Sequence, residues 1–351
     1  YALKRLEPSL EVILLNPNPS SAHPWYKEFE TYPLPNLRLL PSAASLGNLL
    51  LHQAARKLKL DILHDPCGIA PFLFPTTSYK RVTTIHDAIP FIYPETQPLL
   101  TRAVFQTLVR SSRFTADAVF TVSTSAANDL RQHLKIPHDK LFVTPLGIEL
   151  PEKISSPEET QTLRQRLNIT SPYFLYVGAL HPRKNIGRTL EAFLSLRKRV
   201  QNVQLVIVGP PSWGADAVLR QVTDSAKGDT GIVFTGFVSD DDLHTLYQGA
   251  RSLVFPSLYE GFGLPALEAM AHGTPVITSN TSSLPEVVGE AGLLVDPLST
   301  TAIEEAMQHL LDDETLCNTL ARRGLERAKL FSWESTAQKT LTAYQQILGT
   351  R

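Results

Sequence analysis

The sequence predicts an α/β protein with two doubly wound parallel sheets, and three observations lead to this prediction. The chain has 351 residues, more than a single domain of about 100–200 residues needs. Short, β-branched apolar runs alternate with longer helical patterns along its whole length, as in repeated βα units. A polar segment that contains two prolines, residues 148–160, interrupts this alternation near the middle and predicts a linker.

The strand-like runs fall into two groups, one on each side of the linker. Those of the first half are residues 11–15, 61–64, 82–87, 118–123 and 141–147. Those of the second half are residues 173–178, 203–209, 232–237, 252–257, 275–280 and 292–297. An amphipathic helix is predicted near the end, at residues 331–348. We therefore expect one domain at residues 1–150, a second at 151–330, and a terminal helical segment at 331–351.

Composition and charge narrow the class of protein. Hydrophobic residues make up 43% of the chain and charged residues 19%, which supports buried cores and excludes a disordered chain. The formal net charge of -1 lacks the positive field of a duplex-binding protein, so nucleic acid is not expected as a partner. Two cysteines far apart in sequence, Cys67 and Cys317, form no disulfide framework and suit a reducing compartment.

The apolar segments bear on the location of the protein. None reaches the about 18–20 residues that cross a bilayer, and the first residues, YALKRLEPSLEV, lack the apolar core of a signal peptide. We therefore expect a cytoplasmic protein. Residues 46–60 combine an apolar helical face with a basic end, Arg56, Lys57 and Lys59. This segment is interpreted as a core helix, with weak contact at the inner face of an anionic membrane as the alternative.

Residues 253–280 are the most informative stretch and parse as strand, glycine-bearing loop, helix and strand. Gly261 and Gly263 allow backbone N–H groups to approach a ligand closely, and Pro265 suits the first helical position. The positive end of the following helix favours an anion. The segment therefore predicts an anion site.

Two carboxylates flank this predicted helix start. Glu260 lies in the loop, and Glu268 is placed in the first helical turn. Carboxylates accept hydrogen bonds from paired sugar hydroxyls. For each residue alone an ordinary interpretation stays open, with Glu268 balancing the helix dipole and Glu260 solvated in the loop.

A pair of cations, Arg183 and Lys184, follows the predicted strand at 173–178. The carboxyl end of a parallel sheet is where open α/β folds bind ligands. Arginine grips two oxygens and lysine acts as a point charge, so the pair suits a diphosphate. A solvated surface pair is the alternative.

His86 and Asp87 end the strand predicted at residues 82–87, where they would face a cleft between the domains. A structural histidine and an aspartate that caps the next turn are the alternatives. The acidic run at residues 240–242 satisfies a D-x-D metal pattern, but Ser239 as an N-cap explains it better. Because the histidines and cysteines also lack zinc-ligand spacing, no metal is expected.

Together these motifs resemble the retaining glycosyltransferases of glycosyltransferase family 4 (group 1), among them bacterial polysaccharide mannosyltransferases. The matches are E-G-F-G-L-P-x-L-E-A-M-A-x-G-x-P-V-I at 260–277, V-G-x-x-x-x-R-K-N at 177–185, T-I-H-D at 84–87 and P-E-V-V-G-E-A-G-L-L-V-D-P at 285–297. The resemblance implies the GT-B fold, with two Rossmann-like domains facing across a cleft and a last helix that packs back on the first domain. Members of this family usually begin with a strand and a glycine-rich loop. Because the sequence starts at Tyr1, after the position of that unit, we expect it to lack both.

The resemblance further implies roles for single residues. Arg183 and Lys184 neutralise the diphosphate of the donor, Glu268 holds the ribose hydroxyls, and Glu260 holds the transferred sugar. His86 contacts that sugar from the other domain. The remaining donor contacts are Val238 at the base and the loop residues Gly261, Phe262, Gly263 and Leu264.

The expected function is transfer of a hexose from a nucleoside-diphosphate sugar to an acceptor hydroxyl with retention, in polysaccharide or glycolipid synthesis. UDP-hexose such as UDP-glucose is the first choice of donor and GDP-mannose the second, and no metal or other cofactor is expected. A sugar-nucleotide epimerase, a phosphorylase and a two-lobed sugar-binding protein are the alternatives. A nicotinamide dehydrogenase is disfavoured, because the G-x-G-x-x-A fit at residues 261–266 falls in the fourth unit of its domain.

Overall fold

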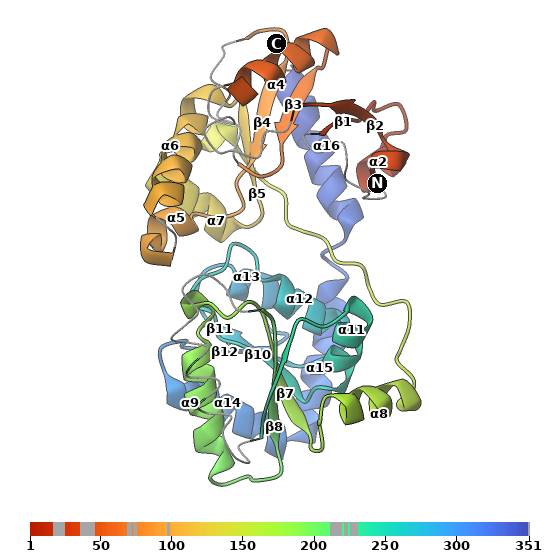
Figure 1. Ribbon diagram of the computed structural model, residues 1–351, viewed down its shortest axis with the longest axis vertical. Helices are drawn as coiled ribbons and strands as arrows, with labels where there is room; N and C mark the ends of the chain where they lie inside the picture. The colour runs from red at the N-terminus through yellow and green to blue at the C-terminus, as the bar shows by residue number, and fades with distance from the viewer. Residues whose placement is uncertain are drawn as a thin grey trace. The chain divides into compact units, whose positions relative to one another are not determined.

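The computed structural model describes residues 1–16, 25–35, 46–68, 72, 76–96, 99–210, 220, 224 and 231–349. The chain divides into two compact units (Figure 1). Unit 1 comprises Tyr1–Pro145 together with Trp333–Arg351, and unit 2 comprises Leu146–Ser332. The chain thus leaves unit 1 a few residues earlier than the sequence predicted and returns to it at the start of the last helix.

Unit 1 is built on a parallel sheet with the strand order β3-β4-β5-β6. These strands are β3 (Ile62–Asp65), β4 (Lys80–Thr84), β5 (Ala118–Thr121) and β6 (Leu141–Val143). β5 is buried along its whole length, as expected of a strand covered on both faces. Its helices are α1 (Ala2–Leu6), α2 (Trp25–Glu28), α4 (Leu46–Lys57), α5 (Ile89–Ile92), α6 (Leu99–Thr115), α7 (Thr124–Asp129), a π-helical turn at Leu130–Leu134, and α16 (Trp333–Gly349).

The strand predictions in unit 1 need correction at several points, and the strand predicted at residues 141–147, for example, ends at Val143. The first predicted strand appears as β1 (Ile13–Asn16), which forms a separate parallel pair with β2 (Glu30–Pro33). β2 was not predicted, because its residues ETYP contain no apolar run. The strand predicted at residues 82–87 ends at Thr84, since register with β5 stops there, so His86 and Asp87 follow the strand.

The last helix, α16, completes the core of unit 1, as the resemblance implied. Its Ala343 and Ile347 pack with Val82 and Phe120 of the sheet, and the ring of Tyr344 stacks on Phe120 at 5.7 Å between centroids. Figure 1 shows α16 alongside the sheet of this unit, although it is the farthest element from it in sequence.

Unit 2 contains a six-stranded parallel sheet with the order β12-β11-β10-β7-β8-β9. The strands are β7 (Tyr173–Val177), β8 (Gln204–Val208), β9 (Ile232–Gly236), β10 (Ser252–Phe255), β11 (Val276–Ser279) and β12 (Leu293–Val295). The helices are α8 (Pro157–Arg166), α9 (Ile186–Arg197), α11 (Asp240–Gly249), α12 (Leu264–Ala271), α13 (Leu284–Val288), α14 (Thr300–Asp312) and α15 (Glu314–Ala328). The strand order reverses between β7 and β10, which marks the edge where doubly wound sheets bind ligands.

The predicted linker is only partly irregular. α8 begins within it at Pro157, behind a capping box formed by Ser156 and Glu159. Proline breaks helix interiors but suits the first helical position, where no backbone N–H is needed. Pro157 therefore starts a helix inside the segment predicted as a linker.

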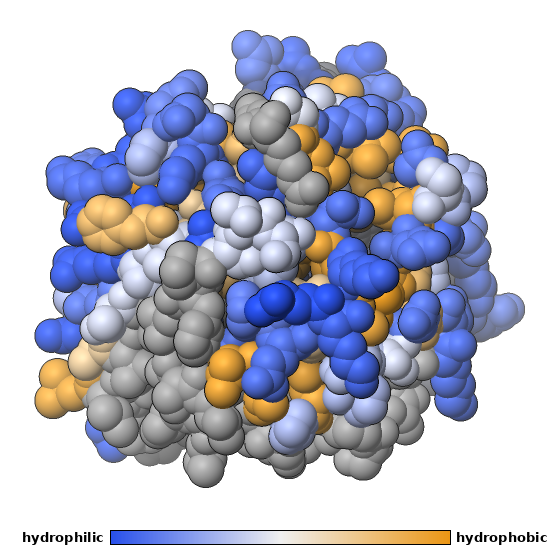
Figure 2. Space-filling view, turned by 90° about the horizontal axis from the view of Figure 1, so that it is seen from above, coloured by the Kyte–Doolittle hydropathy of each residue, from blue (hydrophilic) through white to orange (hydrophobic). Residues whose placement is uncertain are grey.

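Among the residues that the structure describes, no helix is both long enough and apolar enough to cross a membrane. On the face in Figure 2, hydrophilic side chains predominate over the described part, with hydrophobic ones interspersed. In α4 the side chains of Ala54 and Ala55 are buried in unit 1, which agrees with its interpretation as a core helix.

Candidate functional site

Two loops of unit 2 meet at the point where its strand order reverses. The chain leaves β7 into a 3₁₀ turn, Pro182–Lys184, and leaves β10 into the glycine-bearing loop before α12. The backbone N–H of Leu258 donates to the carbonyl of Arg183 at 2.9 Å, so the loops are joined directly. Buried Asn185 adds a second tie, because its side-chain amide donates to the carbonyls of Pro256 and Pro297 at 2.9 and 2.6 Å.

The loops bring both predicted cations onto one predicted carboxylate. Oε1 of Glu260 lies 3.1 Å from Nη1 of Arg183 and 2.9 Å from Nζ of Lys184. The three side chains are only 10%, 12% and 15% exposed, for Glu260, Arg183 and Lys184 respectively. Arg183 also donates to the carbonyl of Tyr259, and Lys184 lies over the ring of Phe255 at 4.8 Å. The cluster holds two positive charges against one negative charge, which suits it to a further anion.

The glycine-bearing loop has a conformation that only glycine supports at Gly263. Its φ is 108°, and a Cβ there would lie 2.6 Å from Cδ2 of Leu284. Oγ of Ser283 lies 2.9 and 2.7 Å from the carbonyl oxygens of Glu260 and Phe262, within donating distance, and holds the loop against α13. Gly261 and Phe262 are buried, whereas Leu264 at the helix start is exposed.

Two details of α12 differ from the sequence prediction. The helix starts at Leu264, so Pro265 is its second residue rather than its first. Glu268 is then the fifth residue and lies beyond the first turn. Because the helix dipole acts mainly within the first turn, the ordinary interpretation of Glu268 loses its physical basis.

Glu268 has a partner that the sequence analysis missed. The buried hydroxyl of Tyr247, on α11, donates to Oε2 of Glu268 at 2.8 Å. Burial and, to a lesser degree, the Glu268 charge raise the pKa of Tyr247 well above its ordinary value, so the phenol stays protonated. No sequence signal links these residues, because they lie on different helices with no shared motif.

The other predicted residues have simpler surroundings. Val238 follows β9 at the edge of the sheet and is half-buried. His86 belongs to unit 1, where its exposed ring has Nε2 3.0 Å from the carbonyl of Pro66. Asp87 accepts the N–H of Ile89 at 2.9 Å, which confirms the capping alternative. The acidic run at residues 240–242 starts α11 behind the N-cap Ser239, as interpreted.

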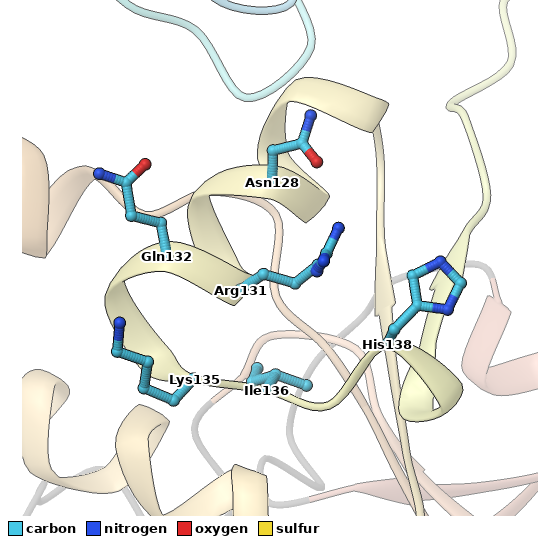
Figure 3. A pocket seen from close by; sticks show the side chains of 6 residues that line it. All are labelled: Asn128, Arg131, Gln132, Lys135, Ile136 and His138. Carbon is cyan, nitrogen blue, oxygen red and sulfur yellow. The ribbon is translucent and has the colours of Figure 1, made fainter.

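Among the residues that the structure describes, no group of three histidine, cysteine, aspartate or glutamate side chains could hold a metal ion. A separate hollow of about 520 Å³ lies in unit 1 (Figure 3), where Arg131 extends between the side chains of Asn128 and His138. None of its lining residues was predicted as a site residue, so it is distinct from the candidate site.

Comparison with known proteins identifies the class. Residues 159–327 match the family described as glycosyl transferases group 1, and residues 2–152 match glycosyltransferase family 4. The chain is 36% identical to O-antigen chain mannosyltransferase B of Escherichia coli, over 83% of this chain and 76% of that protein. It is 32% identical to the serotype-specific mannosyltransferase WbdA of Escherichia coli over 77% of this chain and 34% of that protein. The chain therefore spans about a third of the length of WbdA.

The fold agrees with this result. A sucrose-phosphate synthase from Thermosynechococcus elongatus superimposes with a TM-score of 0.76 at 24% identity, over 97% of this chain and 89% of that one. The fold and the family matches define a GT-B glycosyltransferase. The chain belongs to glycosyltransferase family 4, group 1, and is a hexosyltransferase. This excludes the nicotinamide dehydrogenase, which the sequence already disfavoured, and in the structure the G-x-G loop follows the fourth strand of its unit.

Proposed function

We propose that this enzyme transfers a mannosyl group from GDP-mannose to a hydroxyl group of a growing polysaccharide, with retention at the anomeric carbon. The convergence of Arg183 and Lys184 at the carboxyl edge of the unit 2 sheet carries the nucleoside-diphosphate part of the proposal. The relatives named as O-antigen and serotype-specific mannosyltransferases support mannose as the transferred sugar and a polysaccharide as the acceptor. This reverses the order of donors that the sequence favoured, and a UDP-hexose becomes the second candidate.

The mechanism follows from the charges of the cluster. As the bond between sugar and diphosphate breaks, negative charge grows on the departing phosphate, where Arg183 and Lys184 stabilise it. Preorganised cations act most strongly when water is excluded, and their low exposure provides this setting. The predicted residues include no evident covalent nucleophile, so we propose that the acceptor hydroxyl attacks on the face that the diphosphate leaves and passes its proton to the departing diphosphate.

Glu260 has two states in this mechanism. Without donor its carboxylate pairs with both cations and offsets one of their two charges. A bound diphosphate takes over those cations and leaves the carboxylate to accept hydrogen bonds from hydroxyls of the transferred sugar. Glu268 binds the ribose, Val238 contacts the base, and His86 contacts the sugar from unit 1.

The direct test incubates the purified enzyme with a polymannose acceptor and either GDP-mannose or UDP-glucose. We expect release of GDP and extension of the acceptor by an α-linked mannose, which NMR spectroscopy of the product identifies. Release of UDP with glucose transfer would select the second donor. An inverted linkage would contradict same-face attack.

The acceptor side of the proposal includes a weak membrane contact. Ala55 and Leu51 of α4 pack in the core of unit 1, so we base the contact on the exposed basic side chains of Arg56 and Lys57 at the end of α4 and of Lys59 just after it. Three such residues contribute about 1 kcal/mol each near an anionic surface, and salt screens the attraction. Liposome flotation at low ionic strength should show binding only with anionic lipid, and equal flotation without anionic lipid would contradict the contact.

A further inference from the structure

Glu268 and Tyr247 form a pair whose geometry is fixed from several sides. Tyr247 on α11 directs its hydroxyl to Oε2 of Glu268 at 2.8 Å, and its side chain is buried. The ring of His272 stacks on the Tyr247 ring, with 5.2 Å between centroids and 24° between planes. His244 of α11 packs edge-on against His272 at 4.8 Å. The phenol therefore has little freedom to turn away from the carboxylate.

The histidine also fixes the helix end that carries Glu268. Nδ1 of His272 lies 2.7 Å from the carbonyl oxygen of Glu268. A carbonyl only accepts, so Nδ1 carries the proton. Burial lowers the pKa of His272, which favours this neutral form. The ring is thus held between the Glu268 backbone and the Tyr247 phenol.

The two oxygens of the Glu268 carboxylate consequently differ. Oε2 accepts from Tyr247, while Oε1 has no partner among the residues that the structure describes. The glutamate side chain is only half-buried, so Oε1 is open to a ligand. A carboxylate held in one rotamer binds a ligand without first losing side-chain freedom, which raises affinity.

We propose that Tyr247 is a positioning residue for the nucleotide donor, because it holds Glu268 so that Oε1 receives the ribose hydroxyls. The inference rests on the proposed role of Glu268 and adds a second residue to it. Tyr247 itself touches no donor atom and transfers no proton. Its removal should therefore affect only ligands that have the hydroxyls.

The test compares Tyr247→Phe with the unchanged enzyme by calorimetry, using GDP and 2′,3′-dideoxy-GDP as probes. Phenylalanine keeps the ring that stacks on His272 and removes only the hydroxyl. We expect the Kd for GDP to rise about five- to tenfold and the Kd for the dideoxy probe to stay unchanged. In a Glu268→Ala background, Tyr247→Phe should have no further effect on GDP binding.

The matched control is Tyr173→Phe. Tyr173 is also a buried tyrosine of unit 2, and its hydroxyl donates to the carbonyl of Leu246 at 2.8 Å. The Tyr173→Phe variant should keep the preference of the unchanged enzyme for GDP over the dideoxy probe. If Tyr247→Phe fails to fold, His272→Ala serves instead, because loss of the stacked ring should cause the same selective loss to a smaller degree.

The outcomes separate the inference from the function on which it rests. Equal weakening of both probes by Tyr247→Phe would show a merely structural tyrosine and overturn the inference. An unchanged enzyme that binds both probes equally would overturn the ribose role of Glu268 itself. Selective loss of GDP binding, with mannosyl transfer retained at saturating donor, supports both.

Discussion

Nζ of Lys184 lies 2.9 Å from Oε1 of Glu260, and both side chains are largely buried. The same oxygen pairs with Arg183, so one carboxylate is shared by two cations and the cluster keeps a net positive charge. Charges removed from water are stable only with such partners. The cluster is therefore a place where a diphosphate can replace the carboxylate as the partner of the cations.

Arg183→Ala and Lys184→Ala should each lower kcat about 100-fold, because loss of one preorganised group that faces a developing charge costs about this much. Binding of the free nucleoside diphosphate should also weaken. Steady-state kinetics and calorimetry measure the two effects. Arg166→Ala is the control, since that exposed cation of unit 2 pairs with Asp242. Kinetics close to those of the unchanged enzyme in both variants would show that the pair serves only the fold.

The double variant Arg183→Ala, Lys184→Ala should lose stability out of proportion to either single variant. Each single variant leaves Glu260 one cation, whereas the double variant leaves its buried carboxylate unpaired. The expected loss in the free energy of unfolding is about 3–5 kcal/mol. Urea denaturation at pH 7 measures it. Adding Glu260→Gln should recover part of the loss, and failure to do so would contradict the assigned cause.

Substitutions of Glu260 and Glu268 should have different effects on GDP binding. Glu268→Ala should weaken binding of free GDP, because a ribose contact is lost. Glu260→Ala should spare or strengthen GDP binding, since both cations become free for the diphosphate, while mannosyl transfer falls. Calorimetry with GDP alone, combined with transfer assays, checks this. Equal loss of GDP binding in both variants would contradict the separate assignments.

Activity should survive chelation. Two cations at the diphosphate take the place of a divalent metal ion in neutralising the leaving group. Initial rates measured before and after treatment with excess EDTA should agree. Activity that is lost to EDTA and restored by Mg²⁺ or Mn²⁺ would refute the prediction.

Stability should fall in mild acid because of His64 in unit 1. Its Nδ1 contacts the Tyr344 hydroxyl and its Nε2 lies 2.8 Å from Oγ1 of Thr84. Burial lowers its pKa to about 4 from 6.5. Above pH 6.5 the His64 ring is neutral in both the folded and the unfolded chain. Between pH 6.5 and 4 only the unfolded chain binds the proton, so folding loses up to roughly 3 kcal/mol.

His64→Gln provides the test of this pH dependence, because glutamine keeps polar groups but does not titrate. The melting temperature of the variant should fall less between pH 7 and pH 4.5 than that of the unchanged protein. His138→Gln is the control, since His138 is exposed on the same unit. Parallel pH profiles for the unchanged protein and His64→Gln would exclude His64 as the origin.

The sequence alone determined what depends on neighbours along the chain. The βα alternation predicted the sheets, since parallel strands buried on both faces need continuous apolar runs. Ser239 was predicted as a cap because its hydroxyl reaches an N–H three residues away. Gly261 and Gly263 were predicted to let backbone N–H groups approach a ligand, because glycine allows backbone angles that other residues resist, and Gly263 has such an angle, with φ of 108°.

Only the tertiary structure decided which distant residues meet. Glu260 contacts Arg183 and Lys184 because β7 and β10 are neighbours in the sheet. Local sequence patterns do not determine the order of strands in a sheet. Tyr247 contacts Glu268 because α11 and α12 pack side by side. The helix α16 joins unit 1 because burial of its apolar face against β5 outweighs its distance along the chain. Sequence motifs identified the chemical groups of the site, and tertiary packing determined the geometry of those groups.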